Sequence, residues 1–147
     1  MRFTQPPQPG VKRLQTNIMK QLQDLMNDIS AWSDVTFGDG QRNPAIVYHL
    51  KKEVDELIQA LDYTHAIGVD ESVGAGEFGR QLSKTKMEYA DCFMLLLDSA
   101  HHFGLTAENL LELTREKLEI NKKREWGKPD ANGVVEHIKH PNRPSQA

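Results

Sequence analysis

Two segments of the chain each carry a pair of carboxylates three residues apart. The pairs are Glu53 and Glu56 in HLKKEVDEL, and Glu88 and Asp91 in MEYADCFMLLL. Residues at this spacing share one face of a helix. A carboxylate in a segment as apolar as the second is costly unless it is paired, protonated or bound to a metal. The first pair alone is also typical of a solvated helix surface, so the prediction of a site depends on both pairs together.

A metal site follows from the convergence of the two pairs. Four carboxylates that meet cannot all remain ionised without a cation. Hard divalent ions prefer oxygen ligands, so we predict that Mg²⁺ or Mn²⁺ is held by the acidic side chains of Glu53, Glu56, Glu88 and Asp91. Asp55, which lies between the first two acids, is predicted to point toward solvent.

Four helical segments are expected to position these acids. Apolar residues recur at three- and four-residue steps, which is helical spacing, in four segments at 11–32, 44–63, 82–103 and 106–126. Asn43 followed by Pro44 predicts the start of the second helix, with Asn43 as its N-cap. Gly104 predicts the end of the third. The third segment is apolar in nearly every direction, which predicts burial on most of its sides.

An all-α fold, a four-helix bundle or helical oligomer, is therefore predicted. The length of 147 residues fits one domain. We expect a Pro-rich extended arm at 1–10, the helical domain at 11–138 and a flexible tail at 139–147. GAGEFG, from Gly74 to Gly79, matches the spacing of a dinucleotide-binding loop, but no strand precedes it. We predict instead a flexible Gly-rich loop at 64–80 and a second loop at 33–44.

The composition excludes several classes of protein. The net charge of −3 and the pI near 6.1 give no basic surface of the kind that nucleic-acid binding requires. No apolar run approaches the length of a membrane span, and no signal peptide is evident. The single cysteine, Cys92, suits a reducing compartment and is interpreted as a small core residue. We therefore expect a cytoplasmic protein that binds neither nucleic acid nor membrane.

A cationic patch is predicted at the end of the fourth helix. The inward stripe of Leu110 and Leu113 continues through Lys117, Asn121 and Arg124. Lysine and arginine are also favoured in a last helical turn by the helix dipole alone. Beside a metal site, however, this pattern indicates a phosphate clamp, because a metal ion together with Lys or Arg neutralises polyphosphate charge.

At these motifs the chain resembles the MazG-like, all-α nucleoside triphosphate pyrophosphohydrolases. The E-x-x-E and E-x-x-D pairs and the run K117-x-x-x-N121-x-x-R124-x-W126 carry the resemblance. FGDGQR, HLKKEVDEL and NKKREWGKPD are similar to the phage and bacterial dATP/dGTP pyrophosphohydrolase branch. The 31 residues between Glu56 and Glu88 make this interval longer than in compact members of the family.

The resemblance implies hydrolysis of a (d)NTP between its α- and β-phosphates, giving (d)NMP and pyrophosphate. It also implies dimers or tetramers that complete the bundle, in the cytoplasm of a bacterium or a phage-infected host. The metal would place a water for attack on phosphorus, with Glu53 or Glu56 as the general base. The cationic patch would bind the leaving pyrophosphate. Lys84, one turn before Glu88, either assists or is a surface lysine.

A purine substrate, dGTP or dATP, is the expectation that follows for the base. Aromatic side chains stack on any base, and arginine can bond the O6 and N7 atoms of guanine. The candidates for base contact are Trp32, Phe37, Arg42 and Trp126, although core packing is the default interpretation for each aromatic. His49 projects on the Glu53 side of its helix and is expected either to touch substrate or to lie in an interface.

Two alternatives come from other classes of protein. A di-iron or di-manganese carboxylate bundle needs inward Glu-x-x-His motifs, and the chain offers D62-x-x-H65 and D98-x-x-H101. Asp62 and His65, however, lie about 180° around the helix from the Glu53 pair. The other alternative is a non-enzymatic helical oligomerisation module, in which the acids would have no role in function.

Overall fold

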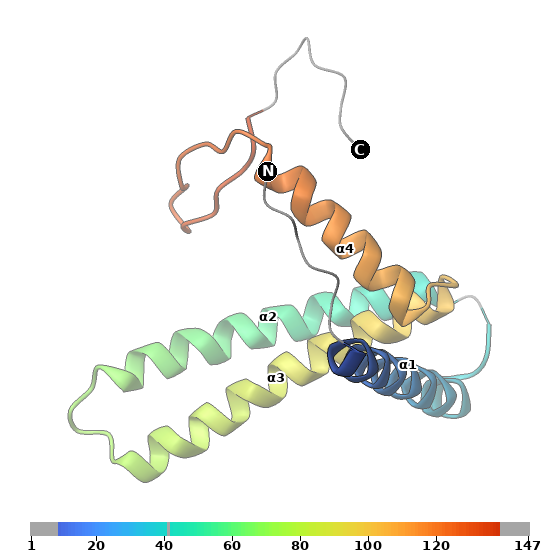
Figure 1. The fold of residues 1–147 in the computed structure, drawn as a ribbon. Coiled ribbons are helices and arrows are strands. Elements are labelled where there is room, and N and C mark those ends of the chain that lie inside the picture. Colours follow the sequence, from blue (N-terminus) through green and yellow to red (C-terminus); the bar gives the residue numbers. More distant parts are fainter. Residues whose placement is uncertain (1–8, 41, 139–147) are drawn as a thin grey trace. The chain divides into compact units, whose positions relative to one another are not determined.

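Four α-helices make up the fold (Figure 1). The computed structural model describes residues 9–40 and 42–138, in which the helices are α1 (Pro9–Phe37), α2 (Asn43–Gly68), α3 (Ala75–His102) and α4 (Ala107–Lys122). The strand signal in these residues is a single antiparallel bridge between Trp126 and His137. The prediction of an all-α fold is confirmed. Within the described ranges, no helix has the length and apolar character needed to cross a membrane.

The hairpin of α2 and α3 is the most extensive packing unit of the chain. The two helices run side by side in opposite directions and are joined by a short turn (Figure 1). Small and polar groups line their contact, where the hydroxyl groups of Thr64 and Thr85 lie 2.7 Å apart. At the closed end, a Cβ atom on Gly68 would lie 3.2 Å from the ring of Phe78. Glycine at position 68 therefore leaves room for the Phe78 ring at this end of the hairpin.

The helix α1 packs against the second half of α3. Its buried side chains recur at helical spacing and are Met26, Ile29, Ser30 and Ser33. The buried residues in the second half of α3 are Leu97, Asp98 and Ala100. The contact is thus part apolar and part polar. The N-terminal end of α4 joins the same unit, because the Ala107 amide donates to the Gln23 side chain at 2.8 Å.

The chain divides into two compact units, 1–107 and 108–147. The second unit holds the rest of α4 and the segment that follows it. There the Gly127 amide donates to the Glu136 carbonyl at 2.9 Å, and the Ile138 amide donates to the Glu125 carbonyl at 2.9 Å. Asp130 accepts from the amides of Asn132 and Val134. This segment is therefore a tight hydrogen-bonded turn.

Several predicted boundaries were wrong. The helix α1 continues to Phe37, so 33–37 is helical rather than loop, because Ser33 bonds to Asp98 on α3 and to Arg42 just before α2, which holds this last turn in place. The helix α3 begins at Ala75, so most of GAGEFG is helical, with Phe78 packed near Gly68.

The helix α2 continues to Gly68 rather than ending near 63, and α4 ends at Lys122 rather than near 126. The N-cap of α2 is Arg42 rather than Asn43, and the Asn43 side chain instead accepts from the Ser99 hydroxyl at 3.3 Å. Gly104 has a φ of +90°, which confirms it as the stop after α3. The predicted arm is already helical at Pro9 and Gly10. Its residues 1–8 and the predicted tail at 139–147 lie outside the described residues.

The prediction that α3 is buried on most sides is wrong for the single chain. Phe93 and Leu96 are 47% and 46% exposed, and Tyr89 on the same stripe is 55% exposed. Further along this side of α3, Leu97 and Ala100 are buried. The apolar character of α3 therefore exceeds what its contacts with α1 and α2 cover.

Candidate active site

Three carboxylates meet across the α2–α3 hairpin. Glu53 and Glu56 lie one turn apart on α2 and face Glu88 on α3, and one carboxylate oxygen from each lies within 4.8 Å of the others. Glu53 and Glu88 are half-buried, whereas Glu56 is exposed. The cluster therefore opens at the surface of the hairpin, where a charged ligand can reach it.

Asp91 lies beside this cluster without belonging to its closest group. It is half-buried and follows Glu88 by one turn. Burial raises the pKa of the Cys92 thiol, and the negative charges of Glu53, Asp91 and Glu88 raise it further. The charges of all three acids thus reach the same thiol, that of Cys92. The thiol stays protonated near neutral pH, which makes Cys92 a poor nucleophile.

His49 contacts the cluster from the preceding turn of α2. Its Nε2 lies 2.9 Å from Oε1 of Glu53, and the Glu53 side chain is 17% exposed. Among the described residues, Glu53 is the one acid of the three-carboxylate group that has a side-chain partner. Helical spacing of four residues is the sequence signal for this contact, although it could not reveal which oxygen is bonded.

The donor set of the cluster suits Mg²⁺ or Mn²⁺. It consists of carboxylate oxygens, the ligands that hard divalent ions prefer. The di-iron alternative requires histidine ligands turned toward the acids. In the part of the chain that the structure describes, neither His65 nor His101 joins the group. Asp98 is instead bonded to Ser33 and paired with His102, so D98-x-x-H101 does not act as a ligand motif.

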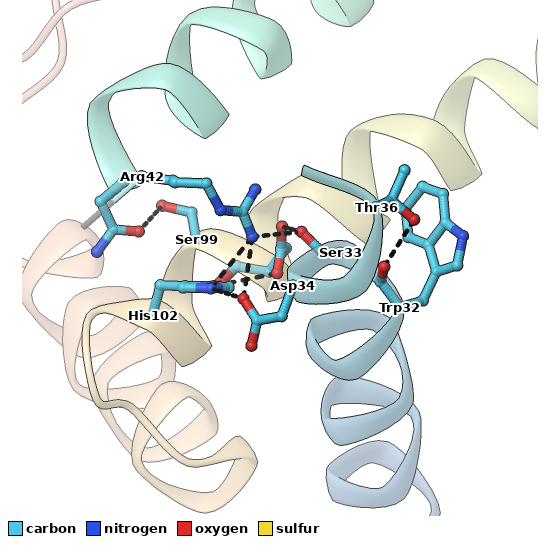
Figure 2. A network of polar contacts seen from close by, with 9 residues as sticks. Trp32, Ser33, Asp34, Thr36, Arg42, Ser99 and His102 are labelled. Carbon is cyan, nitrogen blue, oxygen red and sulfur yellow. Dashed lines mark hydrogen bonds and ion pairs between the residues drawn. The ribbon is translucent and has the colours of Figure 1, made fainter. Parts of the chain in front are cut away.

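A buried polar network lies where the ends of α1, α2 and α3 meet (Figure 2). Arg42 Nη2 donates to the Ser33 hydroxyl at 2.8 Å and to Asp34 Oδ1 at 3.1 Å. Ser33 in turn donates to Asp98 Oδ2 at 2.7 Å. The sequence predicts Arg42 as a contact of the nucleotide base and does not predict this network. The signal that was available is the helical spacing of Asp98 and His102.

His102 bridges the two aspartates of this network. Its Nε2 lies 2.9 Å from Asp34 Oδ1, and its Nδ1 lies 2.9 Å from the Asp98 carbonyl and 3.1 Å from Asp98 Oδ1. Burial lowers the pKa of His102, but the hydrogen bonds and charges of both aspartates outweigh it and leave the pKa raised. The hydrogen bond from His102, together with Arg42, lowers the pKa of Asp34. The network is therefore an alternating arrangement of acids and bases.

The two aromatic candidates on α1 form a pair at the surface. Trp32 and Phe37 meet edge to face at 5.5 Å and are 51% and 57% exposed. The Arg42 guanidinium lies 5.8 Å from the centre of the Phe37 ring, which is a cation–π distance. Neither aromatic is packed in the core of this chain. Both rings are accessible to a stacking ligand.

The predicted phosphate-binding residues lie in the second unit, apart from Lys84, which is exposed on α3. Lys117 and Asn121 line an open groove along α4. Arg124 donates to the Asn121 side chain at 2.9 Å. Trp126 donates from Nε1 to the Asn121 carbonyl at 3.1 Å and lies edge to face against His137. Asn121 thus joins Arg124 and Trp126 into one local group.

These features define an all-α protein with an acid-lined helical hairpin. Residues 82–144 match the family model described as dATP/dGTP pyrophosphohydrolase. The dATP/dGTP diphosphohydrolase of Cyanophage S-2L is 31% identical over 106 residues, which cover 69% of this chain and 97% of the phage protein. The chain belongs to the dATP/dGTP pyrophosphohydrolase family and is a nucleotide pyrophosphohydrolase, as its motifs had indicated. No solved structure matches it.

The stability that the Asp34–His102 pair contributes should depend on pH. The contribution of His102 is complete below its ordinary pKa of 6.5 and is lost as pH rises through the raised value. The contribution of Asp34 is present above its ordinary pKa of 3.8 and is lost as pH falls through the lowered value. Asp34→Asn should therefore lower the free energy of unfolding most between pH 3.8 and pH 6.5, the ordinary pKa values of the two groups. The loss should shrink as pH rises toward 9, about 2.5 units above the ordinary pKa of His102.

Urea unfolding of wild type and Asp34→Asn across this pH range measures the effect. Asp28→Asn, an exposed change on the same helix, is the matched control and should show a pH-independent difference. A loss for Asp34→Asn that grows steadily from pH 7 to 9, a range above the ordinary pKa of His102, would contradict the coupling.

Proposed function

We propose that this enzyme hydrolyses a purine deoxynucleoside triphosphate, dGTP or dATP, to the monophosphate and pyrophosphate, and that it needs Mg²⁺ or Mn²⁺. The observation that carries the proposal is the group formed by Glu53, Glu56 and Glu88 across the hairpin. Membership of the family supports the reaction class, and the name of the phage relative supports purine substrates.

In this proposal the metal is held by Glu53, Glu56 and Glu88, with Asp91 as a further oxygen ligand. When bound there, the ion supplies positive charge against the phosphate oxygens and acidifies water. Glu56 is the better candidate for general base, because one oxygen of Glu53 is already in contact with His49 Nε2 at 2.9 Å. The attacking water loses its proton to Glu56 and forms a bond to the α-phosphorus. The bond from that phosphorus to the bridging oxygen breaks, and pyrophosphate leaves.

The remaining predicted residues are assigned to the two ends of the nucleotide. Lys117, Asn121 and Arg124 are proposed to bind the charge of the leaving pyrophosphate, and Lys84 to assist them. Trp32 and Phe37 are proposed to stack on the purine, since both rings are exposed. Arg42 contributes by holding Phe37 and the end of α1 in place. Trp126 is a second stacking candidate.

We also propose that the enzyme is a homodimer or homotetramer. The apolar stripe of α2 that includes Val54, Ile58 and Leu61 is 40% to 51% exposed. The stripe of Tyr89, Phe93 and Leu96 on α3 is exposed to a similar extent. Contiguous apolar surface on two neighbouring helices is typical of an interface. A second copy of the chain is the occupant that would extend the two-helix hairpin into a bundle.

The site of bond cleavage can be read from an isotope. Hydrolysis of dGTP in water enriched in heavy oxygen should place the label in dGMP and leave the pyrophosphate unlabelled, because water attacks the α-phosphorus. Mass spectrometry of the separated products measures this. Label in pyrophosphate would indicate attack at the β-phosphorus. The appearance of dGDP and orthophosphate as primary products would contradict the proposal altogether.

The metal assignment is tested by Glu88→Gln. Loss of one carboxylate ligand should lower kcat/KM with Mg²⁺ by more than about 100-fold, since even outer-shell changes at metal sites cost about 10- to 100-fold. Asp55→Asn is the matched control, because Asp55 is an exposed acid between Glu53 and Glu56 that lies outside the three-carboxylate group. It should leave turnover near wild type. Near-normal activity in Glu88→Gln would remove α3 from the metal site.

The oligomer is tested by Ile58→Glu, which places a charge in the exposed apolar stripe of α2. We expect a shift toward monomer in light scattering, because burying an unpaired carboxylate in an interface is costly. Gln59→Glu puts the same charge on the neighbouring exposed residue, about 100° around the helix, and should leave the assembly unchanged. A monomeric wild-type protein would contradict this part of the proposal.

A further inference from the structure

The contact between His49 and Glu53 gives one acid of the cluster a fixed orientation. His49 Nε2 lies 2.9 Å from Glu53 Oε1, one helical turn away on α2. The two side chains differ in their surroundings, since that of His49 is 53% exposed and that of Glu53 is 17% exposed. A half-exposed ring thus reaches over a largely enclosed carboxylate, and the remaining lone pairs of that carboxylate are left for another ligand.

The acids of the cluster create a need for such a contact. Glu53, Glu56 and Glu88 carry like charges within 4.8 Å of one another, so each is repelled toward solvent when no cation lies between them. His49 Nε2 lies 2.9 Å from Glu53 Oε1, close enough for a donated hydrogen bond that would oppose this repulsion. Such a bond requires a hydrogen on Nε2, which the neutral imidazole can supply as well as the charged ring.

We propose that His49 is a positioning residue that holds the Glu53 carboxylate in the orientation that ligates the metal. This inference rests on the proposed metal site. Outer hydrogen bonds to ligating carboxylates orient them, and losing one typically costs about 10- to 100-fold in metal affinity or activity. His49 acts through Glu53 and makes no contact with the ion or the phosphate chain.

Three variants at one position separate this role from simple packing. His49→Phe keeps the ring and removes the donor, His49→Ala removes both, and His49→Gln restores an N–H donor. Electron paramagnetic resonance of free Mn²⁺ in titrations of the full-length protein, without nucleotide, measures affinity directly. We expect the Kd for Mn²⁺ to rise about 10- to 100-fold for His49→Phe and His49→Ala, and to stay close to wild type for His49→Gln.

A split in kinetics should accompany the change in affinity. The Mn²⁺ concentration needed for half-maximal turnover should rise in His49→Phe, whereas kcat at saturating Mn²⁺ should stay close to wild type. His65→Phe, an exposed histidine near the other end of α2, is the matched control and should change neither quantity. Circular dichroism confirms that each variant keeps its helices.

Glu53→Gln distinguishes failure of this inference from failure of the metal site. If Glu53→Gln weakens Mn²⁺ binding but His49→Phe does not, the role of His49 is overturned and the site stands. If Glu53→Gln itself leaves binding unchanged, the metal assignment fails and the inference fails with it. Normal Mn²⁺ binding in His49→Phe together with equal losses in His49→Gln and His49→Ala would show that the ring is needed for packing rather than as a donor.

Discussion

Close pairing of α2 and α3 is the constraint on which the site depends, because the carboxylates come from both helices. Glu53 and Glu56 project from α2, and Glu88 meets them only because the α3 backbone runs alongside at short range. Hydroxyl-bearing residues form part of the contact between the two helices. Thr64 and Thr85 bond across it, and the Thr85 side chain is buried. Bulkier residues there would separate the helices and disperse the cluster.

Repulsion among the acids works against this same contact. Three carboxylates within 4.8 Å destabilise the hairpin unless a cation or donor offsets them. The Thr64–Thr85 contact and the closed end at Gly68 and Phe78 hold the helices together beyond the acids. The packing of the hairpin thus holds the three acids close together, and such preorganisation suits a group that could bind a metal ion.

A second polar centre fixes the other end of the hairpin. The network of Ser33, Asp34, Arg42, Asp98 and His102 joins three helices at the place where α1 ends. Glu88 and Asp98 are ten residues apart on α3, about 15 Å along its axis. The acid cluster and this network are therefore separate features of one helix. The first is half-exposed, whereas Asp98 and Ser33 are almost fully buried.

The sequence by itself determined the helical fold and the acids of the candidate site. Periodicity identified the four helices of the described residues, and the three-residue spacing of Glu53 with Glu56 placed both acids on one helix face, because helix geometry is local. Only the tertiary structure decided which groups meet across helices. Glu88 lies in the three-carboxylate group with Glu53 and Glu56, whereas Asp91 lies outside it. Arg42 forms hydrogen bonds to Asp34 and Ser33. The tertiary structure also extended α1 to Phe37 and started α3 at Ala75. Those outcomes depend on packing and hydrogen bonds between residues far apart in the chain, which local spacing does not encode.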